Sequence, residues 1–80
     1  MAVVTLYTRA GCHLCDQAHA VIEQARGQFA FDLEVVNIDR NRDLVRRYGW
    51  DVPVIAVNGV DTFRHRLSAG DLIAALKSAP

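Results

Sequence analysis

The segment Gly11-Cys12-His13-Leu14-Cys15 holds both cysteines of the chain, separated by two residues. An apolar run typical of a buried strand, Ala2 to Thr8, precedes it, and apolar residues at helical spacing follow it. Unpaired N–H groups and the helix dipole favour a thiolate in the first turn of a helix. The sequence therefore predicts that Cys12 is a nucleophile and that Cys15 resolves a mixed disulfide formed on Cys12.

A Cys-x-x-Cys pair is also half of a common structural zinc site, which needs about four ligands. Cys12, Cys15, Asp16 and His19 would share one helix face, so a metal or iron-sulfur binding module is one alternative. The chain has only these two cysteines, which favours dithiol exchange without a bound metal. A second alternative is an interaction domain with redox-inactive cysteines. A purely structural disulfide is disfavoured, because so short a loop constrains little in the unfolded chain.

The length of 80 residues predicts a single domain over residues 1–80. Nine basic and nine acidic residues balance, and 51% of the residues are hydrophobic. This balance implies neither nucleic acid nor membrane as a partner, and the apolar runs are far shorter than the roughly 20 residues that span a bilayer. The start of the chain, Met1-Ala2-Val3-Val4, lacks a basic leader. Together with a pair of free thiols, this predicts a cytoplasmic protein, which we expect to be a monomer.

The rest of the chain predicts three further strands and two further helices. Apolar residues from Leu14 onward predict a first helix that ends near Gly27. Apolar and β-branched runs bounded by turn signals predict the strands, and helical spacing predicts the helices. The strands are expected at 29–39, 52–57 and 60–63, and the helices at 40–49 and after the Ser68-x-x-Asp71 capping box. The order β-α-β-α-β-β-α predicts an α/β protein with a four-stranded mixed sheet flanked by helices.

Two of these segments carry further signals. The dipeptide Asn58-Gly59 between two apolar runs predicts a two-residue hairpin turn. The helix at 40–49 contains four arginines, which favours a solvated outer face. The alternative for those arginines is a docking surface for a carboxylate or an acidic partner protein.

The element order, the Cys-x-x-Cys pair and the Val52-Pro53 start of the third strand together resemble glutaredoxins and the thioredoxin-like superfamily. The run from Leu6 to Cys12 is similar to the strand-to-active-site run of glutaredoxins, and Tyr48 to Val54 is similar to the stretch around their cis-proline. The likeness covers nearly the whole chain and is greatest to small glutaredoxin-like proteins of bacteria. It implies a thioredoxin-like, glutaredoxin-type fold and thiol-disulfide oxidoreductase activity. Glutathione or a protein disulfide would be the substrate, with no resident cofactor.

The resemblance also implies roles for residues away from the cysteines. Val52 and Pro53 would shape the substrate groove, with a cis bond between them. Gly70 and Asp71 occupy the place of the family's Gly-Gly-Asp turn, where backbone N–H groups receive a carboxylate of glutathione. Arg9 stands where glutaredoxins carry a basic residue, which would favour the thiolate or hold a glutathione carboxylate.

Between the cysteines, His13 and Leu14 replace the proline and tyrosine of glutaredoxins, and both are candidate substrate contacts. A protonated His13 would stabilise a neighbouring thiolate and make the site more oxidising. Loss of the tyrosine removes an aromatic surface and a hydroxyl near bound glutathione, so the sequence leaves the use of glutathione open. The tryptophan that precedes the cysteine in thioredoxins is also absent, which disfavours a thioredoxin proper.

Overall fold

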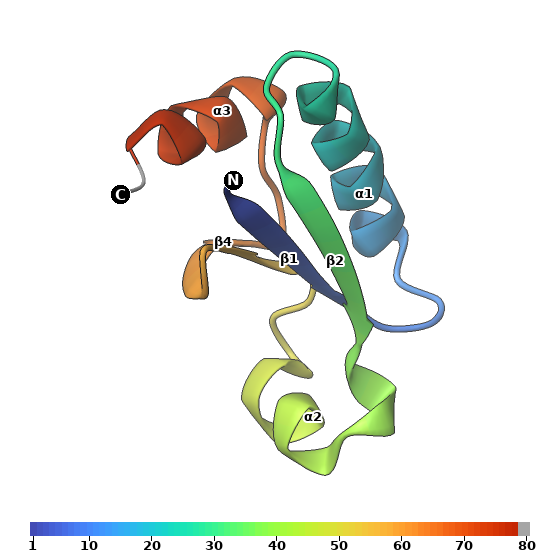
Figure 1. The fold of residues 1–80 in the computed structure, drawn as a ribbon. Coiled ribbons are helices and arrows are strands. Elements are labelled where there is room, and N and C mark those ends of the chain that lie inside the picture. The colour runs from blue at the N-terminus through green and yellow to red at the C-terminus, as the bar shows by residue number, and fades with distance from the viewer. Residues whose placement is uncertain (79–80) are drawn as a thin grey trace.

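The structure is a computed structural model, and it describes residues 1–78. Within these residues it contains the four strands and three α-helices that the sequence predicts, in the predicted order (Figure 1). The strands are β1 (Val3–Thr8), β2 (Asp32–Asn37), β3 (Val54–Val57) and β4 (Val60–Arg64). The helices are α1 (His13–Arg26), α2 (Arg42–Tyr48) and α3 (Ala69–Ser78), with a short 3-10 helix at Ile38–Arg40.

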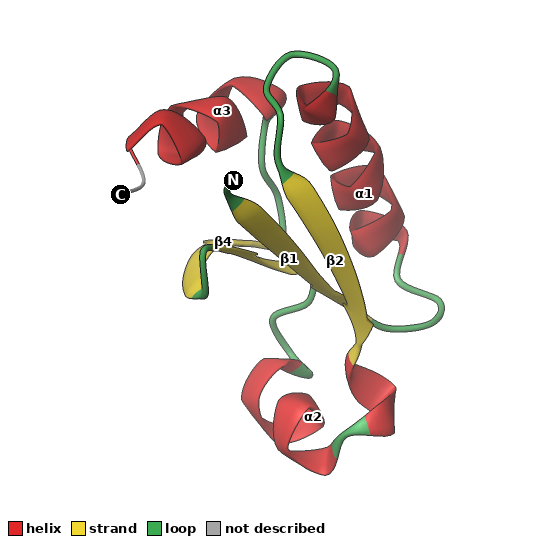
Figure 2. Cartoon of the chain, viewed as in Figure 1, coloured by secondary structure: helices red, strands yellow, loops and turns green. Residues whose placement is uncertain are grey.

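The four strands form one mixed sheet in the order β2-β1-β3-β4 (Figure 2). β1 runs parallel to β2 and antiparallel to β3, and β3 runs antiparallel to β4. The centre of β1 is buried, as its largely apolar run predicts. Neighbouring strands cover both of its edges, and helices cover both of its faces. The predicted α/β class and mixed sheet are thus confirmed.

Helices α1 and α3 cover one face of the sheet, and α1 contacts α3 (Figure 1). The apolar stripe of α1 and the apolar face of α3 meet alternate residues of β1 and β3 in one cluster. Its strand and helix members include Val4, Leu6, Ala18, Ile22, Ile55, Val57, Leu72 and Leu76. This core holds α1, and with it both cysteines, against the central strands.

Helix α2 covers the opposite face through a smaller cluster of Ile38, Tyr48 and Val54. The Tyr48 ring stacks on Tyr7 of β1 with 4.5 Å between ring centroids, and its hydroxyl donates to the Asp61 carboxylate of β4 at 3.0 Å. Burial, followed by the hydrogen bond to Asp61, raises the pKa of Tyr48 to about 12. These contacts fix the end of α2, and therefore the start of the segment that leads into β3.

Two local predictions meet different outcomes. The hairpin turn is confirmed, because Asn58 and Gly59 both have positive φ, at 50° and 84°. The predicted strand at 29–39 is shorter in the structure, since pairing with β1 begins at Asp32 and ends at Asn37. The Asn37 side chain accepts a hydrogen bond from the Asp39 N–H and turns the chain into the 3-10 helix.

No helix within residues 1–78 is both long enough and apolar enough to cross a membrane.

Candidate active site

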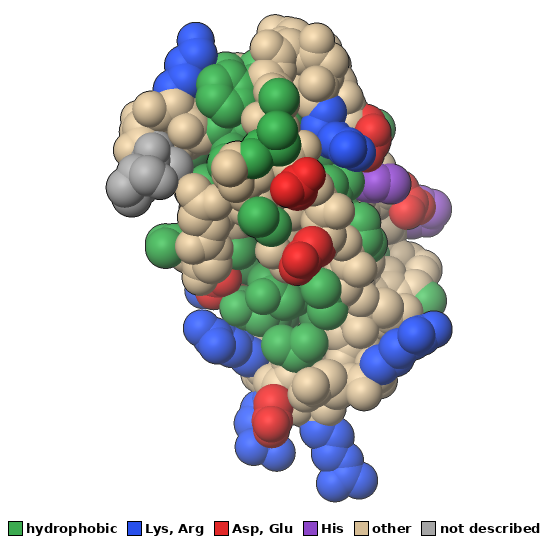
Figure 3. Space-filling view, viewed as in Figure 1, with side chains coloured by type: hydrophobic (Ala, Val, Ile, Leu, Met, Phe, Trp, Pro, Cys, Tyr) green, Lys and Arg blue, Asp and Glu red, His purple; other side chains and the backbone are tan. Residues whose placement is uncertain are grey.

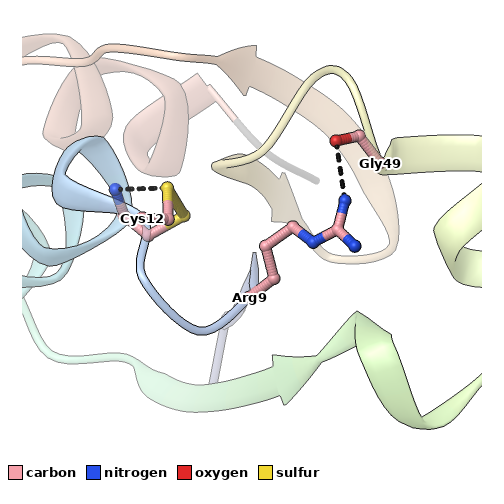
Figure 4. The surroundings of a disulfide bond; sticks show 4 residues. Arg9, Cys12 and Gly49 are labelled. Carbon is pink, nitrogen blue, oxygen red and sulfur yellow. Dashed lines mark hydrogen bonds between the residues drawn. A yellow bond between two sulfur atoms is a disulfide. The ribbon is translucent and has the colours of Figure 1, made fainter.

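The cysteine pair lies where β1 passes into α1, and the two residues form a disulfide. Cys12 is the N-cap of α1, with an extended backbone at φ −95°. Its sulfur accepts a hydrogen bond from the Cys15 N–H at 3.1 Å (Figure 4), and its carbonyl accepts one from the Asp16 N–H at 3.2 Å. The sulfur of Cys12 therefore receives one of the N–H groups that a helix start leaves unpaired, and this favours a thiolate after reduction.

The two cysteines differ in their access to solvent. Cys15 is buried, with 1% of its surface exposed, whereas Cys12 is only partly buried. Their Cα atoms lie 5.2 Å apart, a usual separation for bonded cysteines. Cys12 therefore offers a substrate some exposed surface, while Cys15 is screened by the protein. This agrees with the predicted division into a nucleophile and a resolving thiol.

Pro53 lies at the same end of the sheet as the cysteine loop. The bond between Val52 and Pro53 is cis, as the resemblance implies. Because β3 runs antiparallel to β1 with Val54 opposite Tyr7, the start of β3 adjoins the end of β1 that leads to Cys12. Pro53 is buried and Val52 is half-buried. The predicted contact of these two residues with a substrate stays a prediction.

Arg9 has partners within the protein. Its Nη2 donates to Asp39 at 2.8 Å, and its Nη1 donates to the Gly49 carbonyl at 3.2 Å. In Figure 4 its guanidinium group points toward Gly49 and away from the sulfur atoms of the disulfide. Arg9 thus ties the loop before Cys12 to the segments on either side of α2. Its predicted contact with the thiolate or with glutathione stays a prediction.

The other predicted contact residues lie in two different places. His13 is exposed in the first turn of α1, and the partly buried Leu14 lines a pocket beside that turn. Gly70 and Asp71 lie in the first turn of α3 and are both exposed. The Asp71 N–H already donates to the Ser68 hydroxyl at 3.1 Å, as the predicted capping box requires. A role for Gly70 and Asp71 in binding a substrate stays a prediction.

Sequence reasoning missed the turn at Arg64, His65 and Arg66. The His65 N–H donates to the Pro53 carbonyl at 2.8 Å, so this turn lies directly against the start of β3. Counting back across the Asn58-Gly59 hairpin would have placed residue 64 opposite Pro53. A bulge between Ile55 and Ala56 shifts that register by one residue. The hairpin was therefore the signal that could have pointed to this segment.

The residues at the start of α1 are the candidate ligands for the alternative of a metal site. Cys15, Asp16 and His19 lie on α1 and Cys12 caps its start, but residues 1–78 contain no group of three or more His, Cys, Asp or Glu side chains arranged to hold a metal ion. The Nε2 of His19 lies 3.7 Å from Glu23, one turn further along α1. The two cysteines form a disulfide in which Cys12 is partly exposed, and a disulfide can exchange with thiols.

The chain is similar in sequence and in fold to known proteins. A model of the glutaredoxin-like domain (DUF836) matches residues 3–77. A protein of Methanothermobacter thermautotrophicus named "Probable Thioredoxin" is 32% identical over 76 residues, which cover 91% of this chain and 89% of that protein. A structural-genomics target protein from X. campestris is 39% identical, with a TM-score of 0.82 over 96% of this chain and 99% of its own. A mutant thioredoxin from Halobacterium salinarum, 20% identical, shows the same fold with a TM-score of 0.66 over 96% of this chain and 73% of its own.

Proposed function

This chain belongs to the glutaredoxin-like domain (DUF836) family, and on that premise we propose that it is a thiol-disulfide oxidoreductase acting through Cys12 and Cys15. The asymmetry of the pair carries the proposal. Cys12 is partly exposed and its sulfur accepts an N–H hydrogen bond at a helix start, and Cys15 is buried one turn away. A helix start favours a thiolate at Cys12, and a buried neighbour is suited to intramolecular attack rather than to capture of a second substrate.

Reduction of a substrate disulfide proceeds in two exchange steps. The Cys12 thiolate attacks one sulfur of the substrate, forms a mixed disulfide, and releases the other substrate sulfur as a thiolate that takes up a proton. Cys15, after losing its proton, attacks the sulfur of Cys12 and expels the second substrate thiolate. The dithiol loses two electrons and the substrate gains two. The same steps in reverse oxidise a substrate dithiol.

We favour a protein or peptide disulfide over glutathione as the main substrate. The Arg9 guanidinium is already engaged by Asp39 and Gly49, and the Asp71 N–H is engaged by Ser68. These are groups that the family resemblance assigns to glutathione carboxylates, and each would have to exchange a partner to bind one. A cytoplasmic location agrees with the proposal, because a reducing compartment keeps catalytic cysteines available as thiols.

Exchange with hydroxyethyl disulfide tests the proposal, because this substrate is small and uncharged. Wild-type protein, Cys12→Ser and Cys15→Ser would be reduced and mixed with the disulfide, and their products followed by mass. We expect Cys12→Ser to lose the exchange, because it lacks the nucleophile. Cys15→Ser should react once and accumulate a mixed disulfide on Cys12. Full activity of Cys12→Ser would rule out the mechanism. The two variants serve as controls for each other, because each lacks one thiol and they differ only in which cysteine is replaced.

A further inference from the structure

A pocket of about 160 Å³ lies between α1 and the segment that joins β4 to α3. Part of its wall is apolar and part is polar. Its main apolar residues are Leu14, Val21 and Leu67, and its polar residues are Gln17, His65 and Arg66. Leu14 directly precedes Cys15 in the sequence, so the pocket begins on the helical turn that carries the disulfide.

In the polar part of the pocket, Arg66 carries a positive charge that has no acidic partner among the described residues. Arg66 forms no ion pair within residues 1–78. The two residues before Arg66 do have an acidic partner, Asp51. The Nη1 of Arg64 donates to its carboxylate at 2.9 Å, and the Nε2 of His65 lies 3.9 Å from it. The residues that line the pocket include no Asp or Glu. An uncompensated guanidinium beside an apolar wall suits a ligand that joins a carboxylate to a short aliphatic stem.

Backbone hydrogen bonds hold His65 and Arg66 at the pocket. The Arg66 N–H donates to the Arg64 carbonyl at 2.7 Å, and His65 between them has a φ of 67°. These values describe a γ-turn of the rare positive-φ type. The His65 N–H also donates to the Pro53 carbonyl at 2.8 Å, which fixes the turn against the start of β3. A non-glycine residue with this φ is strained, and such residues concentrate at ligand sites.

We propose that this pocket selects, among peptide and protein disulfides, those that carry a glutamate or aspartate about three residues from the target cysteine. The inference rests on the proposed function and names a substrate class for that same site. The pocket extends along α1 from Leu14 to Val21, about 10 Å at 1.5 Å per residue, which an extended peptide covers in about three residues. The substrate carboxylate pairs with Arg66, and its methylene groups lie against the nearest part of the apolar wall.

Two synthetic peptide disulfides test this selection. They are identical except for Glu or Lys at the third residue from the cysteine, and kcat/KM is measured for each. We expect wild-type protein to prefer the Glu peptide about tenfold, and Arg66→Glu to abolish or reverse the preference. Arg46→Glu makes the same charge change on α2, where Figure 3 shows Lys and Arg side chains projecting from that end of the molecule. This control should keep the wild-type preference, because Arg46 does not line the pocket.

The outcomes separate the pocket from the proposed function. Equal rates for the two peptides, or a preference that Arg66→Glu leaves intact, would overturn the pocket proposal. So would a preference that only Arg46→Glu abolishes. If hydroxyethyl disulfide is exchanged but neither peptide is preferred, the pocket proposal alone fails. If no disulfide is exchanged, the proposed function fails and the pocket proposal fails with it.

Oxidised glutathione, measured in parallel, distinguishes two sources of the carboxylate. A loss in Arg66→Glu that is confined to the Glu peptide supports a pocket for longer peptide substrates. A loss that extends to oxidised glutathione also supports carboxylate binding by Arg66, and it adds a small disulfide to the substrates that use the pocket.

Discussion

The backbone N–H of Cys15 donates a hydrogen bond to the sulfur of Cys12 at 3.1 Å, inside the first turn of α1. The buried residue thus donates a hydrogen bond to the sulfur of the partly exposed one. In the proposed mechanism, the N–H of Cys15 stabilises negative charge on Cys12 during attack on a substrate, and the thiol of Cys15 then resolves the intermediate. The proposed roles of the two cysteines differ because one caps the helix and the other is buried in the core.

This asymmetry predicts different reactivity of the two thiols in the reduced protein. We expect limiting iodoacetamide to label Cys12 well before Cys15, because Cys15 is 1% exposed and Cys12 accepts the N–H hydrogen bond. Peptide mass analysis after short labelling times measures the two rates. Labelling after unfolding in urea is the control and should remove most of the difference. Faster labelling of Cys15 in the folded protein would contradict the assigned roles.

The hydroxyl of Tyr48 predicts an alkaline limit to stability. Its pKa is raised from 10.0 to about 12 in the folded protein, first by burial and then by Asp61. The folded state therefore holds this proton more tightly than the unfolded state does. The resulting stability is fully present below pH 10 and is lost as the pH rises through about 12, by roughly 2 to 3 kcal/mol.

Urea unfolding of wild-type protein and Tyr48→Phe between pH 9 and pH 12 measures this contribution. Tyr48→Phe keeps the ring that stacks on Tyr7 but has no proton to lose. We expect the wild type to lose more stability than the variant over this range. Parallel curves for the two proteins would contradict the linkage.

The contacts of Arg9 predict a structural role that a double-mutant cycle can measure. Arg9→Ala should lower the free energy of unfolding by about 1 kcal/mol, because it removes the bonds to Asp39 and to the Gly49 carbonyl. The coupling between Arg9 and Asp39 should be about 0.2 to 1 kcal/mol, since both side chains are partly exposed. The exposed pair of Glu23 and Arg26 on α1 is a matched control. Unchanged stability together with slower disulfide exchange would instead indicate that Arg9 contacts the substrate.

Two substitutions of Asn58 should separate the contributions of turn geometry and of hydrogen bonding to stability. Its φ is 50°, and its side-chain oxygen accepts a hydrogen bond from the Val3 N–H at 2.9 Å. Asn58→Gly keeps the backbone geometry and loses that hydrogen bond, whereas Asn58→Ala loses the bond and strains the turn. We expect Asn58→Ala to be less stable than Asn58→Gly by about 1 kcal/mol in urea unfolding. Equal stabilities would show that the positive φ has no energetic weight.

Local signals in the sequence predict most of the fold because they act over a few residues. The apolar stripe of α1 defines a helix that the structure gives as His13–Arg26, and Asn58-Gly59 defines the hairpin turn. The second strand was predicted too long, because β-propensity at its ends does not show where pairing with β1 stops. Its length depends on a contact with a distant strand, which no local pattern records.

In the candidate site, too, some features could be predicted from the sequence and others could not. The cysteine pair could be predicted from a short motif, whereas the cis bond before Pro53 was implied only by the resemblance to glutaredoxins. The partners of Arg9 could not, since they lie 30 and 40 residues away in the sequence. The positive φ of His65 could not be predicted either, because few residues other than glycine adopt one and the hydrogen bond that helps to hold the turn is accepted by Pro53, 12 residues away in the sequence.

The central claim is that Cys12 and Cys15 form a redox-active pair, and a redox titration tests it most directly. The protein is equilibrated in glutathione buffers of graded poise and its free thiols are alkylated and counted by mass. We expect a two-electron transition, a tenfold change in the equilibrium ratio per 29.6 mV, between about −270 and −120 mV, the range of thioredoxin-fold oxidoreductases. Two thiols that stay reduced at every poise, or a disulfide that no glutathione buffer reduces, would contradict the account.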